Sequence, residues 1–408
     1  MSGEATILMV DVFVVLLVAL ALLAMVSRRL AVPYTLALVL FGLLISLLAP
    51  RLEVRVTPEL ILAIFVPGLI FDAAFRLDVT ALRRNLLGVA LLAVPGVVIV
   101  AGIVATVLHL ATGLDYQAAF LVGAMVSATD PVAVISTMRH MHAPERLANL
   151  VEAESLFNDG TGVVLFSIAI SGGDLLVHGT VTFLTVAIAS TVIGLGAGLV
   201  VTWAAARTED VNVELTLTLI AAYGTYLVAD GLGQSGIIAT LVAAMVLGNY
   251  GARSGMSSRG RVAIDTVWSY LAFLLTALVF LVIGLTITPG ELVGAAEPIL
   301  WGVVAVILGR AVVVYGLIGG IGRSPLGRRL RLGLPLGWLH VLFWSGLRGA
   351  IAVALALSLP ESMPDRQVLQ STVFGLVLFT LLVQGGTAGA VLRWAGAHAV
   401  EAESPSPG

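Results

Sequence analysis

Long apolar runs dominate this chain of 408 residues and restrict it to folds that a lipid bilayer can solvate. Hydrophobic residues make up 59% of the sequence and charged residues only 11%, against about 25% charged residues in soluble domains. A soluble fold of this length needs more polar surface than that. A membrane-spanning helix, in contrast, needs about 20 apolar residues. The sequence therefore predicts an all-α polytopic membrane protein.

Short breaks that contain charged residues, glycine or proline divide these runs into thirteen predicted transmembrane helices. Their approximate limits are 6–26, 31–49, 58–75, 86–111, 117–138, 147–171, 176–205, 212–230, 235–250, 264–287, 293–321, 335–358 and 368–395. Residues 1–400 form one predicted transmembrane domain. The polar residues 401–408, which include two prolines, form a predicted disordered cytoplasmic tail.

The distribution of arginine predicts the orientation of these helices. All 21 basic residues are arginine; with thirteen crossings, sixteen lie on the side of the C-terminus and three on the other side. Cytoplasmic loops carry the excess of basic residues. The N-terminus is therefore predicted to lie outside and the C-terminus in the cytoplasm.

Two predicted helices, the fifth and the twelfth, are interrupted in mid-membrane. The fifth contains Ser127-Ala128-Thr129-Asp130-Pro131, and the twelfth contains Ser345-Gly346-Leu347-Arg348-Gly349. Proline removes a backbone donor, and glycine lowers the cost of unwinding. Broken helices at corresponding positions of two halves are typical of inverted repeats with a binding site at the membrane midplane. We therefore expect two inverted six-helix repeats around an odd seventh helix.

The polar residues of the sixth helix provide oxygen ligands beside this break. Ser155 lies one turn from Asp159, about 40° around the helix axis. Small hard cations prefer carboxylate, carbonyl, hydroxyl and water oxygens, which Asp159, Ser155, Thr129 and Asp130 would supply. A buried carboxylate also binds a proton, because burial favours the neutral acid. A cation and a proton would then compete for Asp159, unless Asp159 and Asn158 serve only to bond neighbouring helices.

The remaining charges inside the membrane need partners, because unpaired charges there are costly. We expect Glu154 and Arg348 to form a structural ion pair that joins the sixth and twelfth helices. Asp72 and Arg310 are a second expected pair, although Asp72 could instead lie near Arg76 at the cytoplasmic surface. Glu152 lies two turns from Asp159 and either lines a cytoplasmic approach or sits in interfacial water.

Three segments resemble the signature sequences of the NhaP/NHE-type sodium/proton antiporters. They are Ala128-Thr129-Asp130-Pro131, Glu154-Ser155-Leu156-Phe157-Asn158-Asp159-Gly160 and Gly346-Leu347-Arg348-Gly349-Ala350-Ile351, in the order and spacing of that family. The resemblance covers roughly residues 5–395.

The resemblance implies more than the spacing does. It implies a homodimer in the cell membrane, built from a dimerisation bundle and a six-helix transport bundle that moves like an elevator. It also implies a Na+ site at Asp159, Ser155 and Thr129, with Asp130 assisting and Asn158 holding the crossing. Family members with Asn-Asp at these positions exchange one cation for one proton without net charge movement.

Other functions fit the sequence less well. A K+/H+ antiporter is the nearest alternative, because selectivity depends on ligand spacing that the sequence does not contain. A cation channel would line a continuous pore, whereas these charges cluster around two broken helices. An intramembrane hydrolase lacks a histidine or lysine base near Ser155. No cofactor is expected: cysteine is absent, and no basic cluster indicates nucleic acid.

Overall fold

The computed structural model describes residues 18–25, 27, 33–48, 57–172, 177–251, 255–325, 327 and 333–396, and all regular secondary structure within them is helical. The helices of the first half are α2 (Tyr34–Leu48), α3 (Pro58–Leu60), α4 (Val66–Arg76), α5 (Val79–Leu91), α6 (Val97–Thr112), α7 (Tyr116–Met125), α8 (Val132–His140), α9 (Glu145–Ser171) and α10 (Val177–Ala205). Those of the second half are α11 (Val211–Leu219), α12 (Thr225–Gly231), α13 (Gly236–Val246), α15 (Ser258–Thr286), α16 (Pro289–Gly294), α17 (Ala296–Ala311), α18 (Gly319–Arg323), α20 (Leu336–Trp344), α21 (Ala350–Leu357), α22 (Arg366–Phe379) and α23 (Gly386–Trp394).

Short π-helical turns join several of these segments into longer helices. They lie at Ile61–Phe65, Leu92–Gly96, Ile220–Gly224, Leu247–Gly251, Val312–Ile318 and Thr380–Gly385. Pro95 lies inside the second turn, where it lacks the N–H that an α-helical turn would require. Seven of the resulting described helices are long and apolar enough to cross a membrane, and they include Val79–Thr112, Ser258–Thr286 and Arg366–Trp394.

The described helices agree with the predicted segments from 31–49 onward, and the chain is a multi-pass helical membrane protein. The largest differences are at charged helix starts. The helix predicted at 86 begins at Val79, where the Asp78 side chain accepts a hydrogen bond from the Thr80 N–H. The helix predicted at 264 begins at Ser258, with Ser257 as its N-cap. Hydropathy finds the apolar part of a helix, whereas capping side chains determine where it begins.

The ends of the chain are described only in part. In the predicted first helix, 6–26, residues 18–25 are helical and residues 6–17 and 26 lie outside the described residues. The predicted tail, 401–408, also lies outside them. The thirteen crossings and the two inverted repeats stay predictions.

Both predicted helix breaks are confirmed. The first separates α7 from α8 at residues 126–131, and the second separates α20 from α21 at residues 345–349. Pro131 directly precedes α8, and Gly349 directly precedes α21. The two breaks therefore place four helix ends inside the molecule.

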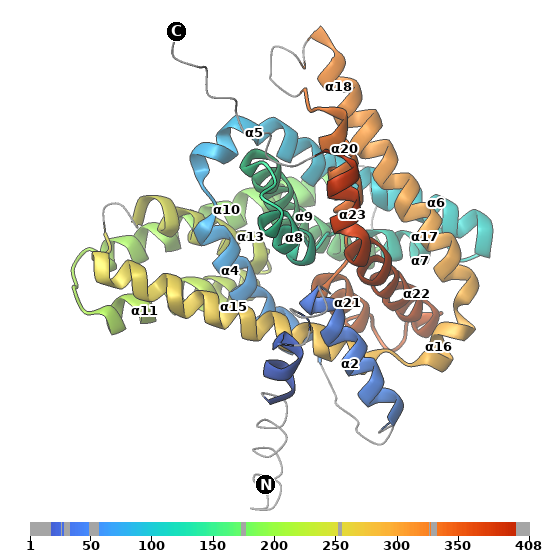
Figure 1. The fold of residues 1–408 in the computed structure, drawn as a ribbon, viewed down its shortest axis with the longest axis horizontal. Helices are drawn as coiled ribbons and strands as arrows, with labels where there is room; N and C mark the ends of the chain where they lie inside the picture. Colours follow the sequence, from blue (N-terminus) through green and yellow to red (C-terminus); the bar gives the residue numbers. More distant parts are fainter. Residues whose placement is uncertain are drawn as a thin grey trace, which may run out of the picture.

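The helices form two groups with a central set of helices between them (Figure 1). On one side α10, α11 and α13 pack near α15, and on the other α6 and α7 pack with α17 and α22. Helices α8, α9 and α21 lie between these groups. Close backbone approach tightens the packing: a Cβ on Gly42 of α2 or Gly284 of α15 would overlap the backbone of the other helix.

Candidate ion-binding site

The two helix breaks touch each other directly, next to α9. The Asp130 N–H donates a hydrogen bond of 2.8 Å to the Leu347 carbonyl, which joins the two unwound segments. The Arg348 N–H donates to Thr380 Oγ1 over 3.0 Å, so α22 and its π-helical turn also support the second break. Unwound backbone inside a membrane must be satisfied by protein in this way.

Asp130 lies at the N-terminal ends of two half-helices. Its Oδ1 accepts a hydrogen bond of 3.0 Å from the Val132 N–H in the first turn of α8. Its carboxylate also touches Gly349, the residue before α21, so closely that a Cβ there would overlap Oδ2. Helix N-termini carry partial positive charge, so one carboxylate can stabilise both ends.

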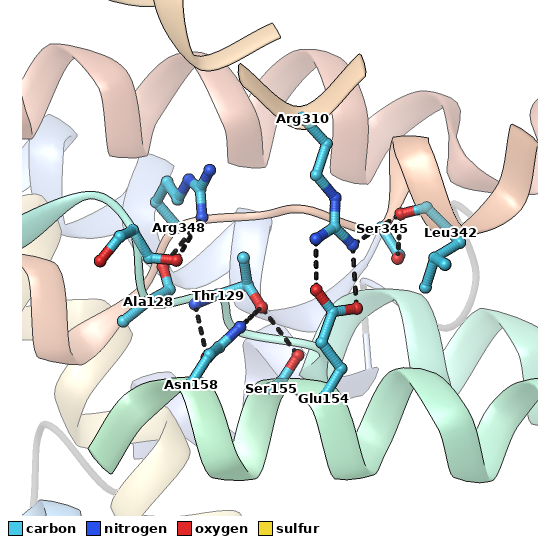
Figure 2. Close-up of polar contacts among 10 residues, drawn as sticks. Ala128, Thr129, Glu154, Ser155, Asn158, Arg310, Leu342, Ser345 and Arg348 are labelled. Atoms are coloured by element: carbon cyan, nitrogen blue, oxygen red, sulfur yellow. Dashed lines mark hydrogen bonds and ion pairs between the residues drawn. The ribbon is translucent and has the colours of Figure 1, made fainter. Parts of the chain in front are cut away.

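Two arginines occupy the opposite, C-terminal ends (Figure 2). Arg348 Nη1 donates to the carbonyls of Ser127 and Ala128, each over 3.1 Å, just beyond the end of α7. Arg310 Nη2 donates to the Leu342 carbonyl over 2.7 Å, in the last turn of α20. Positive charge at helix C-termini offsets their partial negative charge.

Glu154 forms its ion pair with Arg310, not with Arg348. Arg310 Nη2 lies 3.0 Å from Glu154 Oε2, and Arg310 Nη1 bonds Glu154 Oε1. The two residues are 5% and 1% exposed, which makes this a buried, bidentate pair. The predicted Glu154–Arg348 pair is therefore wrong. Arg348 instead bonds the backbone carbonyls that the first break leaves free, and its Nε and Nη2 have no hydrogen-bond partner among the described residues.

The predicted Asp72–Arg310 pair is also wrong, because Arg310 pairs with Glu154. Arg310 is occupied by Glu154, and Asp72 pairs over 2.8 Å with Arg76, one turn further along α4. This i, i+4 pairing is the alternative that the sequence left open.

A hydrogen-bonded network joins the first break to α9. Asn158 Oδ1 accepts from the Thr129 N–H over 3.1 Å, and Asn158 Nδ2 donates to Thr129 Oγ1 over 2.7 Å. Thr129 Oγ1 and Ser155 Oγ lie 2.9 Å apart. All three residues are 1–2% exposed. Asn158 thus bonds the first break to α9, and Ser155, one turn before Asp159, lies within hydrogen-bond distance of Thr129.

Asp159 faces a cavity of about 540 Å³ that Thr129 and Asp130 also line. Its side chain is partly exposed, and no described residue forms a hydrogen bond or ion pair with its carboxylate. Ser155 lies behind Thr129 and does not line the cavity. The cavity is thus lined by two acidic residues, Asp130 and Asp159, and by Thr129.

The same cavity extends to a charged mouth. Glu152, seven residues before Asp159 and so about 10 Å away along α9, lines it and pairs with Arg139 over 3.4 Å. On the other wall, Arg76 binds Asp72 and also reaches Asp265 and Ser269 of α15. Glu152 therefore lines the same cavity as Asp159. Of the two positions predicted for Glu152, this is the approach to the site rather than interfacial water.

Sequence reasoning missed several residues that line this cavity or bind its lining residues. Arg139 carries no sequence signal for this role, because it lies thirteen positions before Glu152, in α8 rather than α9, and no local pattern joins the two. Asp265 and Ser269 gave no signal, since their partner Arg76 is distant in sequence. Gly349 was read as a helix breaker, whereas the structure also places it against Asp130.

The fold and the site define a class of protein: a multi-pass helical membrane protein whose two broken helices cross beside a cavity-facing carboxylate. Among the described residues there is no cluster of three or more His, Cys, Asp or Glu side chains that could hold a structural metal. Any ion at Asp159 would instead be bound by one or two carboxylates and neutral oxygens, which suits reversible binding.

Residues 14–394 match the family model for the transmembrane region of the sodium/hydrogen exchangers, and the chain belongs to this family. It is 41% identical over 371 residues to the low-affinity Na+/H+ antiporter NhaS1 of Synechocystis sp., covering 89% of this chain and 69% of that protein. It is 34% identical over 349 residues to the Na+/H+ antiporter NhaP of Pseudomonas aeruginosa, covering 82% and 81%.

A solved structure shares the fold. The sodium proton antiporter MjNhaP1 of Methanocaldococcus jannaschii aligns with a TM-score of 0.76, over 96% of this chain and 99% of that one, at 21% identity. This likeness supports the helical architecture. The family is one of transporters, not of enzymes.

Proposed function

We propose that this protein exchanges Na+, or Li+, for H+ across the cell membrane, through competition of the cation and the proton for Asp159. One observation carries the proposal: Asp159 is the carboxylate at the helix crossing that faces the cavity and has no partner among the described residues. An unpartnered acid at membrane depth marks a functional site. Such a group can bind either ion and release it again.

The residues around Asp159 support this role. A cation that enters past Glu152 meets two carboxylates and the oxygen atoms of Thr129 in one cavity. We assign Na+ to Asp159, Ser155 and Thr129, with Asp130 assisting from the starts of α8 and α21. Ser155 Oγ lies 2.9 Å from Thr129 Oγ1 on the side away from the cavity, so an ion held by all three residues would lie deeper than the cavity surface, beside both hydroxyls.

We also propose that the exchange is electroneutral, with one proton for each cation. Asn158, one residue before Asp159, is a neutral amide bonded twice to Thr129, so it adds no second exchanging carboxylate. Glu154 and Arg310 balance each other. A single carboxylate that trades one unit charge for another moves no net charge, so the membrane potential does no work.

Alternating access would follow the elevator scheme of the family. Six helices around the crossing form the proposed transport bundle, and the others form the dimerisation bundle of a homodimer. The proposed protein crosses the membrane thirteen times in two inverted repeats, has its N-terminus outside and uses no cofactor. Arg76 and Arg139 line the charged end of the cavity, which supports a cytoplasmic position for this end under the positive-inside rule.

Exchange can be tested in vesicles that contain the purified protein and an internal pH dye. We expect NaCl or LiCl added outside to dissipate a pH gradient at a rate that does not depend on the membrane potential. Asp159→Asn should abolish this response. Asp115→Asn is the matched control, because Asp115 is the exposed N-cap of α7 and asparagine also caps helices.

The other outcomes select the alternatives. A response to KCl alone would keep the mechanism and identify a K+/H+ antiporter. Cation flux without proton counter-movement would identify a channel and reject the proposal. Exchange at the normal rate in Asp159→Asn would remove Asp159 from the site.

A further inference from the structure

A second, basic pocket lies away from the crossing, between α5, α9 and the helix that continues α17. Its volume is about 260 Å³, and Arg83, Arg84 and Arg146 line it. The site described above uses none of these residues. Three guanidinium groups around one pocket concentrate positive charge, which an anion would offset.

The pocket is built from two helices that hold their arginines together. Arg83 and Arg84 lie in the second turn of α5, and both are exposed. Arg146 comes from the first turn of α9, and its Nε donates over 3.1 Å to Asn85, the next residue after Arg84. Neither Arg83 nor Arg84 forms an ion pair with a described residue, and no acidic residue lines the pocket. The positive charge of Arg83 and Arg84 is therefore available to a ligand.

The rest of the pocket is apolar. Leu92, Leu150 and Ile318 are buried at 2–3% exposure and form its base. Leu86 and Leu87, which follow the arginines on α5, are 52% and 39% exposed. Charged groups thus meet exposed leucines where the long helix Val79–Thr112 enters its apolar stretch. A free phosphate would use only the arginines, whereas a phospholipid would use both parts.

We propose that this pocket binds the headgroup of an anionic phospholipid, with the phosphate at Arg83, Arg84 and Arg146 and an acyl chain along Leu86 and Leu87. Arginine binds phosphate through two parallel N–H···O hydrogen bonds. Basic pockets between membrane helices suit anionic headgroups. Arg146 belongs to α9, the helix that carries Asp159 thirteen residues later, so a lipid would hold one end of the ion-binding helix.

The experiment uses the purified full-length chain in a neutral detergent and measures binding of fluorescently labelled phosphatidylglycerol. Each arginine near an anionic headgroup contributes about five-fold in affinity. We expect Arg83→Gln/Arg84→Gln to weaken binding about 25-fold. The matched control is Arg259→Gln/Arg261→Gln, two exposed arginines at the start of α15, which should leave binding within about two-fold.

Two further arms separate a lipid from other anions. Unlabelled phosphatidylglycerol should displace the probe, and phosphatidylcholine or inorganic phosphate should not. Leu87→Ser should weaken lipid binding with both arginines still present. Equal losses in the two double variants would overturn the proposal, and so would displacement by inorganic phosphate as effective as displacement by lipid.

This test is independent of ion exchange, since it reads binding alone. All four substituted arginines are exposed, so the variants should keep the melting temperature of the parent protein in detergent without lipid.

Discussion

The buried face and the cavity face of the helix crossing neutralise charge in different ways. On the buried face, Glu154 is matched by Arg310, and Arg348 is bonded to two carbonyls. On the cavity face, Asp130 bonds a helix N-terminus, and Asp159 has no partner among the described residues. This difference supports two proposed roles: the paired charges would hold the broken helices together, and the unpaired carboxylate of Asp159 would bind the transported ions.

The largest expected effect on stability comes from breaking the buried pair. Glu154→Gln leaves Arg310 without its counter-ion, and removal of one member of a buried pair costs about 3–5 kcal/mol. Thermal unfolding in detergent should therefore show a large loss of stability, while Asp159→Asn should show none.

The double variant Glu154→Leu/Arg310→Met sharpens this prediction. It removes both charges and should recover much of the loss, because apolar side chains can replace a buried pair. If Glu154→Gln were as stable as the parent protein, the pair would not hold the crossing.

A smaller effect on stability is expected from Gly349→Ala, which adds one methyl group against the Asp130 side chain. The new Cβ would overlap Asp130, and forcing extra atoms into a packed site costs about 1–3 kcal/mol. Lower thermal stability and slower exchange should appear together, because Asp130 must move away from α8 or α21.

Gly102→Ala is the control, since a Cβ there meets nothing within 4 Å. It lies within α6 and should leave stability unchanged or slightly raised, because alanine favours helix more than glycine does. Equal behaviour of the two variants would show that the contact at Gly349 has no energetic consequence.

The smallest effect is expected at the cavity mouth. Arg139 is 64% exposed at its side chain, so its pair with Glu152 contributes less than about 1 kcal/mol to stability. Arg139→Gln should leave unfolding unchanged but lower the KM for the cation at low salt, because it removes a positive charge from the approach. High ionic strength should abolish the difference. Arg207→Gln, an exposed arginine after α10, should not change KM.

The helices and the helix breaks could be predicted from the sequence because each depends on local residue types. Apolar length marks the spans, and Pro131 and Gly349 mark the breaks. Partner choice could not be predicted, because two acids and two arginines inside the membrane allow more than one pairing. The carbonyls at Ser127 and Ala128 that bind Arg348 carry no residue-type signal. The Asp72–Arg76 pair was visible as an i, i+4 spacing.

The contrast between α9 and the other long helices was also visible in the sequence. Within eight residues α9 carries three acids, Glu152, Glu154 and Asp159. The structure gives each a different environment: the mouth, the buried pair and the cavity. Helical spacing places Glu154 about 140° around the axis from Asp159, so the two side chains face different ways, but it does not determine which neighbour each one meets.

In the proposed mechanism one carboxylate, that of Asp159, binds both ions in turn. The most direct measurement is the initial rate of Na+-driven exchange in vesicles as a function of Na+ concentration at several pH values. Competition predicts that the KM for Na+ rises as the pH falls, approaching about tenfold per pH unit, while the maximal rate stays constant. A KM that does not change with pH, with a maximal rate that does, would contradict a shared site.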